Sequence, residues 1–146
     1  MHYFVAYDGS DLSEAALRRV ASLADPEEDA VAVGTALPRN DTEFARERGW
    51  LDEDEAFDAA LVAERARRDV RRTLPAAEYA TADVGRHAPA GKVGSALRRM
   101  AREADAETVV VGSDNAGGVV TSVSSVASSV AADDEYDVLI VRHDRR

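Results

Sequence analysis

The segment from Thr108 to Val141 most constrains the fold, because two apolar runs in it flank a glycine-containing turn and a stretch rich in serine and valine. The runs Thr108–Val111 and Val138–Val141 are continuously apolar, as expected for strands buried on both faces of a sheet. Valines between them recur at helical spacing, at Val119, Val123, Val126 and Val130. We therefore predict a strand, a turn at Gly112, a helix and a final strand. Backbone N–H groups at the start of such a helix favour an anion such as phosphate.

Three further apolar runs predict strands over His2–Tyr7, Ala30–Leu37 and Tyr79–Val84. Helical patterns separate the strands, so five strands alternate with four helices. This alternation predicts a single doubly wound α/β domain over residues 1–146, with a parallel sheet and helices on both faces. In open sheets of this kind the ligand crevice lies beyond the carboxyl ends of the strands, where the strand order reverses.

The helix starts are predicted from acidic pairs three residues apart. Asp11 with Glu14, and Asp52 with Glu55, have the form of capping pairs before apolar stripes at helical spacing. The acidic segment 38–51 between these helices has no regular pattern. A run of arginines in the second of these helices, paired with Glu64 and Asp69, indicates a solvated helix face or a surface for an acidic partner. The run comprises Arg65, Arg67, Arg68, Arg71 and Arg72.

Composition excludes several classes of protein. The formal net charge is −10, from 28 acidic and 18 basic residues, and this opposes binding to the phosphate backbone of DNA or RNA. The absence of cysteine excludes disulfides and thiolate metal sites. No stretch approaches the roughly 20 apolar residues of a membrane span, and we expect a cytoplasmic protein. An acidic chain with Lys92 as its sole lysine also resembles proteins of salt-loving microbes, including halophilic archaea.

Two motifs together resemble the universal stress protein family: Tyr7-Asp8-Gly9-Ser10 after the first strand, and Gly112-Ser113 after the fourth. The resemblance spans nearly the whole chain and implies the strand order 3-2-1-4-5. It also implies a stress-response regulator that is non-enzymatic or has at most weak ATP-hydrolysing activity, and a homodimer that pairs through the edge strand Val138–Val141. Such an edge is rarely left unpaired in proteins.

Family members that bind ATP carry a glycine, two residues, a second glycine, nine residues and then Gly-Ser or Gly-Thr. Gly112 matches the first glycine, Asn115 stands at the second, and Ser124-Ser125 stands at the pair with one residue fewer between. The resemblance thus implies ATP or AMP as the ligand. The residues expected at this nucleotide site are Ala6, Asp8, Val111, Gly112, Asn115, Ser124, Ser125 and Val126.

Other interpretations remain open. Asp8 is equally suited to a turn that caps the following helix. The missing glycines favour an interaction module without a nucleotide. The related adenine-nucleotide α-hydrolases carry Ser-Gly-Gly-x-Asp-Ser after the first strand, where this chain has Asp8-Gly9-Ser10-Asp11, so that enzyme class is disfavoured. The three histidines lack metal-ligand spacing. Trp50, the sole tryptophan, is expected to anchor a loop or to line a subunit contact.

Overall fold

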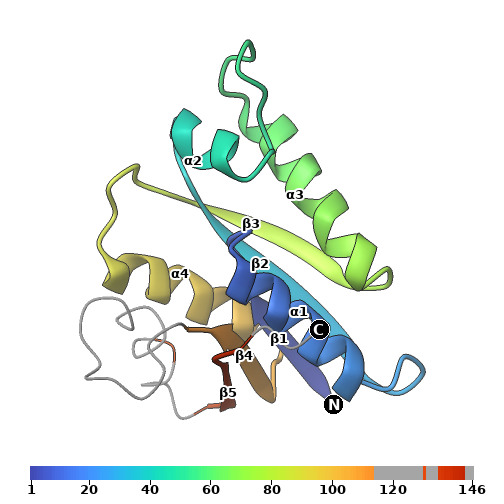
Figure 1. Cartoon of the computed structure of the whole chain (residues 1–146). Helices are drawn as coiled ribbons and strands as arrows, with labels where there is room; N and C mark the ends of the chain where they lie inside the picture. The colour runs from blue at the N-terminus through green and yellow to red at the C-terminus, as the bar shows by residue number, and fades with distance from the viewer. Residues whose placement is uncertain (114–129, 131–134, 144–146) are drawn as a thin grey trace.

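The computed structural model of the protein describes residues 1–113, 130 and 135–143. Within those residues the chain forms five strands and four helices (Figure 1). In chain order they are β1 (His2–Ala6), α1 (Asp11–Leu23), β2 (Ala30–Pro38), α2 (Thr42–Glu47), α3 (Ala59–Thr73), β3 (Glu78–Val84), α4 (Ala90–Glu103), β4 (Thr108–Gly112) and β5 (Asp137–Val141). The helix predicted over residues 119–130 lies outside the described residues except for Val130, which is buried.

All five strands are parallel and lie in the order β3-β2-β1-β4-β5. The register places Val5 of β1 beside Val33 of β2 and Val110 of β4. The predicted α/β class and the strand order 3-2-1-4-5 are therefore confirmed. Because the order reverses between β1 and β4, the carboxyl ends of these two strands diverge into separate connections, and a crevice is expected at that point.

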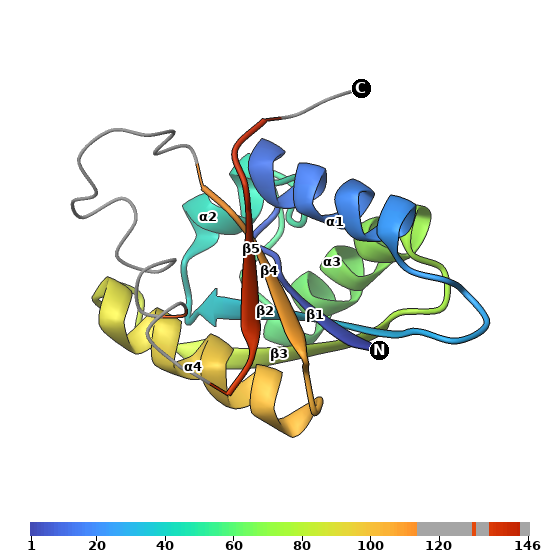
Figure 2. The ribbon, with the colours of Figure 1, turned by 90° about the horizontal axis from the view of Figure 1, so that it is seen from below.

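Helices cover both faces of the sheet. Helices α1 and α3 pack on one face, and α4 packs on the other (Figures 1 and 2). Side chains alternate along β1, so Val5 packs with α1 and α3 while Phe4 packs with Leu97 and Met100 of α4. Burial on both faces explains why the central strands are continuously apolar, since Phe4–Ala6 of β1 and Val109–Val111 of β4 are all buried.

The helix starts differ from those predicted. Ser10, not Asp11, caps α1: its side chain accepts a hydrogen bond from the backbone N–H of Ser13. Helix α3 begins at Ala59 behind the cap Asp58, and the predicted pair lies in the loop before it. Asp52 and Glu55 do bond there, through the Asp52 N–H and the Glu55 carboxylate at 2.8 Å. The two residues of this capping pattern therefore contact each other in a loop and do not begin a helix.

The segment 38–51, for which no pattern was found, contains the short helix α2 and a deeply buried tryptophan. Asp41 caps α2 by accepting from the N–H of Phe44. The Trp50 side chain is only 1 % exposed and packs against Tyr7 and Phe44, with ring centroids 6.0 Å away in both cases. Its indole N–H donates to Asp69 of α3 at 2.8 Å. Trp50 thus anchors this loop to the core, which is one of the two roles expected for it.

Strand β5 is not buried on both faces, contrary to the prediction. It lies at the edge of the sheet, where Val138 and Leu139 are half-buried and Ile140 is 39 % exposed. Only Val141 is buried, in the core under α1. The apolar character of this strand consequently exceeds what packing within the described residues requires.

Candidate functional site

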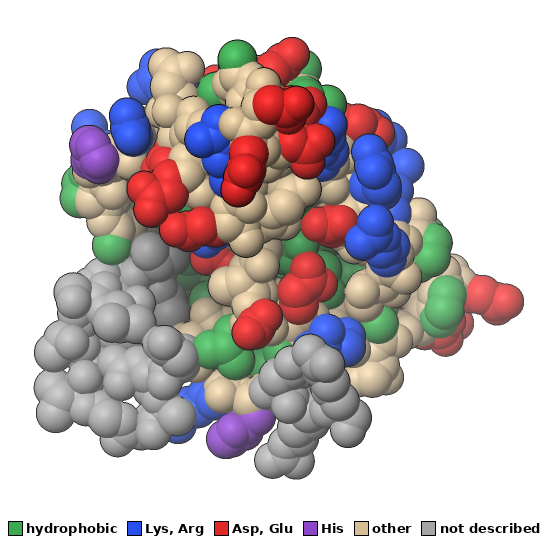
Figure 3. Space-filling view, turned by 45° about the horizontal axis from the view of Figure 1, so that its top comes forward, with side chains coloured by type: hydrophobic (Ala, Val, Ile, Leu, Met, Phe, Trp, Pro, Cys, Tyr) green, Lys and Arg blue, Asp and Glu red, His purple; other side chains and the backbone are tan. Residues whose placement is uncertain are grey.

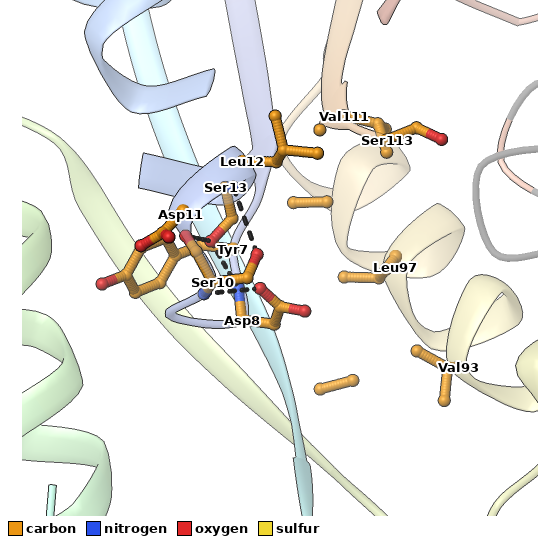
Figure 4. A pocket seen from close by; sticks show the side chains of 13 residues that line it. Tyr7, Asp8, Ser10, Asp11, Leu12, Ser13, Val93, Leu97, Val111 and Ser113 are labelled. Carbon is orange, nitrogen blue, oxygen red and sulfur yellow. Dashed lines mark hydrogen bonds between the residues drawn. The ribbon is translucent and has the colours of Figure 1, made fainter. Parts of the chain in front are cut away.

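A cleft of about 570 Å³ opens at the carboxyl ends of β1 and β4, a volume typical of small-molecule sites. The turn after β1 and the start of α1 form one side, and α4 forms the other, with Val93 and Leu97 facing the opening (Figure 4). The cleft is thus at the reversal of strand order, as expected. Its lining residues are Ala6, Tyr7, Asp8, Ser10, Asp11, Leu12, Ser13, Ala36, Val93, Leu97, Val111, Gly112 and Ser113.

The turn after β1 is held by its own side chains. The Asp8 carboxylate accepts from the Ser10 N–H at 2.9 Å, and the Asp8 N–H donates to the Ser13 hydroxyl at 3.3 Å. Gly9 has a φ of +79°, where a side chain is strained. A Cβ there would also lie 2.9 Å from the Trp50 ring. One Asp8 oxygen is therefore committed to the turn, and the other is directed toward the cleft (Figure 4).

Gly112 brings the end of β4 against the first turn of α1. A Cβ at Gly112 would lie 2.5 Å from the backbone oxygen of Leu12 and 2.7 Å from its carbonyl carbon. These are backbone atoms in a capped helix, so they cannot rotate away as a side chain would. The glycine therefore has a packing role that is independent of any ligand.

The cleft walls are apolar, but the charges that face it are acidic. Ala6, Val111 and Leu97 supply apolar surface, whereas the charged lining residues in the described part of the chain are Asp8 and Asp11. The sequence from residue 113 to residue 135 contains no lysine, arginine or histidine. The described part of the cleft is thus better suited to a group with little charge than to a polyanion, which the two carboxylates repel.

A buried polar cluster supports the turn from behind. The Tyr7 hydroxyl donates to the Glu14 carboxylate at 2.6 Å. Burial raises the pKa of Tyr7, and the bond to Glu14 raises it further. Burial also raises the pKa of Glu14, although the Tyr7 hydroxyl opposes that shift. Arg48 reaches the same turn from α2 and donates its Nε–H to the Asp8 carbonyl. The turn is therefore held by residues of α1 and by Arg48 at the end of α2, without any contact from a ligand.

The structure brings four of the eight predicted site residues together around this cleft: Ala6, Asp8, Val111 and Gly112. Asn115, Ser124, Ser125 and Val126 lie outside the described residues. Residues 1–113, 130 and 135–143 contain no group of three or more potential metal ligands. No helix in the same part of the chain is long and apolar enough to cross a membrane.

Several lining residues were not predicted from the sequence. Ser13 is buried and bonds both Asp8 and Ser10, and its position three residues after the cap Ser10 is the signal that identifies it. Val93 and Leu97 were assigned to a helical stripe without a role in a site. Only the crossover that places α4 beside β4 turns that stripe toward the cleft.

Known structures share this fold. A universal stress protein solved in complex with cAMP is 24% identical, with a TM-score of 0.63, and the match covers 99% of this chain and 98% of that one. A universal stress protein from Archaeoglobus fulgidus is 24% identical, with a TM-score of 0.55 over 97% and 93% of the two chains. A hypothetical protein from a structural-genomics test case is 14% identical, with a TM-score of 0.65 over 99% and 97%.

The amino-acid sequence also relates this chain to universal stress proteins. No curated protein matches this chain significantly. The profile of the Universal stress protein family, however, matches residues 2–142, which include all five strands and both sides of the cleft. The chain therefore belongs to the universal stress protein family.

Proposed function

We propose that this chain is a regulator of the stress response that binds an adenine nucleotide weakly in the cleft at β1 and β4. We propose that this role is regulatory, is carried out in the cytoplasm and does not involve catalysis. The observation that carries the proposal is the Asp8 carboxylate beside an apolar slot at the reversal of strand order. The cAMP complex of a related universal stress protein supports the same ligand class.

The charge of the cleft selects among adenine nucleotides. Asp8 and Asp11 both line it, and the segment from residue 113 to residue 135 contains no lysine, arginine or histidine. Repulsion between like charges rises with each phosphate added. We therefore propose a ligand with few charges, such as cAMP or AMP, in preference to ATP. Adenine would lie on the apolar wall near Val111 and Leu97, and Asp8 would accept a hydrogen bond from the ribose.

Asp8→Asn is expected to weaken cAMP binding about tenfold or more, because a hydrogen bond to a charged group contributes about 1.5–3 kcal/mol. Asparagine keeps an oxygen for the Ser10 N–H, so the turn survives while the free carboxylate oxygen is replaced by a donor. Calorimetry at fixed salt measures the change.

Asp11→Asn is the matched control, since it removes the same charge from the same cleft. It is expected to leave cAMP affinity unchanged or to increase it. Equal losses in both variants, or tighter binding of ATP than of cAMP to the parent, would contradict the proposal.

We also propose that two copies pair through β5. The observation that favours this is the exposed apolar edge at Ile140, which the described part of one chain leaves open. The same edge pairing is implied by resemblance to the family.

Ile140→Glu is accordingly expected to convert a dimer into a monomer, because it places like charges on both sides of a two-fold axis. Analytical ultracentrifugation at micromolar concentration measures the change. Leu23→Glu is a suitable control, since Leu23 is 52% exposed at the end of α1 and away from the edge of the sheet. A parent protein that sediments only as a monomer would refute the pairing.

A further inference from the structure

A second hollow, of about 470 Å³, lies between α3 and the connection that leads to it from α2. None of the described residues that line it also lines the cleft at β1 and β4. We call it the α3 hollow. Figure 3 shows basic side chains gathered on the flank of the molecule where α3 runs in Figure 1. The residues that line it are Arg48, Gly49, Trp50, Asp52, Arg65, Arg68, Asp69 and Arg72.

Four of these eight residues are arginines, in a protein whose net charge is −10. Two of the arginines are neutralised by carboxylates. Arg65 forms a two-pronged ion pair with Glu55 at 2.5 and 3.0 Å, and this pairing lowers the pKa of Glu55 to about 2. Arg72 pairs with Asp69 at 3.2 Å. Both predicted partners are engaged, Asp69 by Arg72 and Glu64 by Arg67 at 3.6 Å outside the hollow, whereas the Arg65–Glu55 pair was not predicted. Ion pairs with Glu55 and Asp69 thus account for two of the four arginines in the hollow.

Arg48 is held in place by groups that carry no formal charge. Its guanidinium lies 3.6 Å from the centre of the Phe44 ring and donates to the carbonyl oxygens of Asp8 and Phe44. Its one carboxylate contact in the described residues is a 3.7 Å approach to Glu47, whose side chain is 64% exposed. A contact of this kind contributes little. The Arg48 side chain is thus largely buried and held in one orientation. Its positive charge is not neutralised by a close carboxylate among the described residues.

Arg68 is exposed and forms neither a hydrogen bond nor an ion pair with any residue that the structure describes. It stands one helical turn from Arg65 and Arg72 and also from Glu64, whose carboxylate pairs with Arg67, so two cations neighbour it on α3. An unpaired cation among cations is unfavourable unless an anion joins it. Two arginines with uncompensated charge, Arg48 and Arg68, therefore line one hollow.

We propose that the α3 hollow binds a compact phosphate dianion, either inorganic phosphate or a phosphomonoester. Guanidinium groups match phosphate oxygens with paired N–H donors and cannot lose their proton. Among the described residues that line the hollow, only Trp50 and Gly49 are uncharged, so this lining offers little surface for a base or an acyl chain. Asp52 and Asp69 also line the hollow, so like-charge repulsion limits the occupant to a small anion that contacts the arginines.

Arg68→Gln tests the proposal without disturbing known contacts, because the side chain has no partner to lose. We expect the parent to bind inorganic phosphate with shifts in the NMR signals of the Trp50 indole N–H and the Arg48 Nε–H. Arg68→Gln should weaken that binding at least about tenfold. Arg71→Gln is the matched control: Arg71 is exposed on the same helix but does not line the hollow. It should change the affinity less than about twofold.

The source of the phosphate group is resolved by comparing methyl phosphate with a capped phosphoserine tripeptide. Equal affinities indicate a small metabolite, and much tighter binding of the tripeptide indicates a phosphorylated side chain. Both results support the proposal. It is overturned if inorganic phosphate shifts neither signal, or if Arg68→Gln and Arg71→Gln reduce the affinity equally. The second result would mean that the helix attracts anions through its overall charge and has no built site.

Discussion

Trp50→Ala is expected to lower the free energy of unfolding by about 3–5 kcal/mol, as removal of a large buried aromatic side chain does elsewhere. Trp50 is 1 % exposed and joins the loop after α2 to Tyr7 of the sheet and to Asp69 of α3. Because small domains are stable by only about 5–15 kcal/mol, the variant should lose a large part of its stability.

Urea unfolding followed by circular dichroism measures this effect, since the variant lacks the only tryptophan. The urea concentration at the midpoint of unfolding should fall, while the dependence of the unfolding free energy on urea concentration stays the same. Trp50→Phe separates packing from hydrogen bonding: it retains most of the buried ring but loses the N–H that donates to Asp69 at 2.8 Å. It should cost about 1–3 kcal/mol. A loss below about 1 kcal/mol for Trp50→Ala would mean that the loop is not anchored by this residue.

The sheet could be predicted from the sequence because several independent patterns indicate the same strands. Each central strand is a run of apolar residues that no helix pattern interrupts, and alternation with helices leaves few topologies. The order of the strands was not contained in these patterns and came from the resemblance to the family. The edge position of β5 likewise followed from that resemblance and not from the local pattern, because Val138–Val141 is as apolar as the buried run Thr108–Val111. Apolar character alone does not distinguish a strand covered by its own chain from one left open.

The predictions of the first residues of α1 and α3 were wrong for a local reason. An acidic or hydroxyl residue followed three positions later by glutamate occurs at helix starts and in loops alike. Asp11-Glu14 lies one residue late because Ser10 already caps α1, and Asp52-Glu55 satisfies a loop. The true cap of α3, Asp58, is followed three positions later by Leu61 and carries no such pattern. Capping patterns therefore indicate that a helix is near but do not fix its first residue.

The candidate site was predictable where backbone geometry dictates the residue type. Asp8 and Gly112 were identified as ends of strands beside a turn, and both line the cleft. The arginines of the α3 hollow were visible only as a helix face. Arg48 belongs to a segment without any pattern, and it joins Arg68 only through the packing of Trp50 against the core. Proximity between segments that are distant in sequence is the part of the site that local patterns do not contain.

Gly112→Ala is expected to destabilise the protein by about 1–3 kcal/mol, the usual cost of an added methyl group in a well-packed site. The new Cβ would lie 2.5 Å from the Leu12 oxygen, whereas ordinary contact begins at 3.4 Å. Either α1 or β4 must therefore move by about 1 Å to restore normal separation. Gly91→Ala is the matched control, because a Cβ at this exposed position in α4 meets nothing within 4 Å. It should leave stability unchanged or raise it by up to about 1 kcal/mol.

The same pair of variants distinguishes the two reasons for a glycine at the end of β4. Displacement of α1 carries Ser10 and Ser13 with it, and these residues hold Asp8 at the cleft. If packing requires Gly112, Gly112→Ala loses stability in urea unfolding even with no nucleotide present, and its cAMP affinity falls as a consequence. If only the ligand requires it, the variant unfolds at the parent's urea concentration and loses cAMP binding alone. The 2.5 Å approach to a helix backbone predicts the first result, because that contact exists whether or not the cleft is occupied.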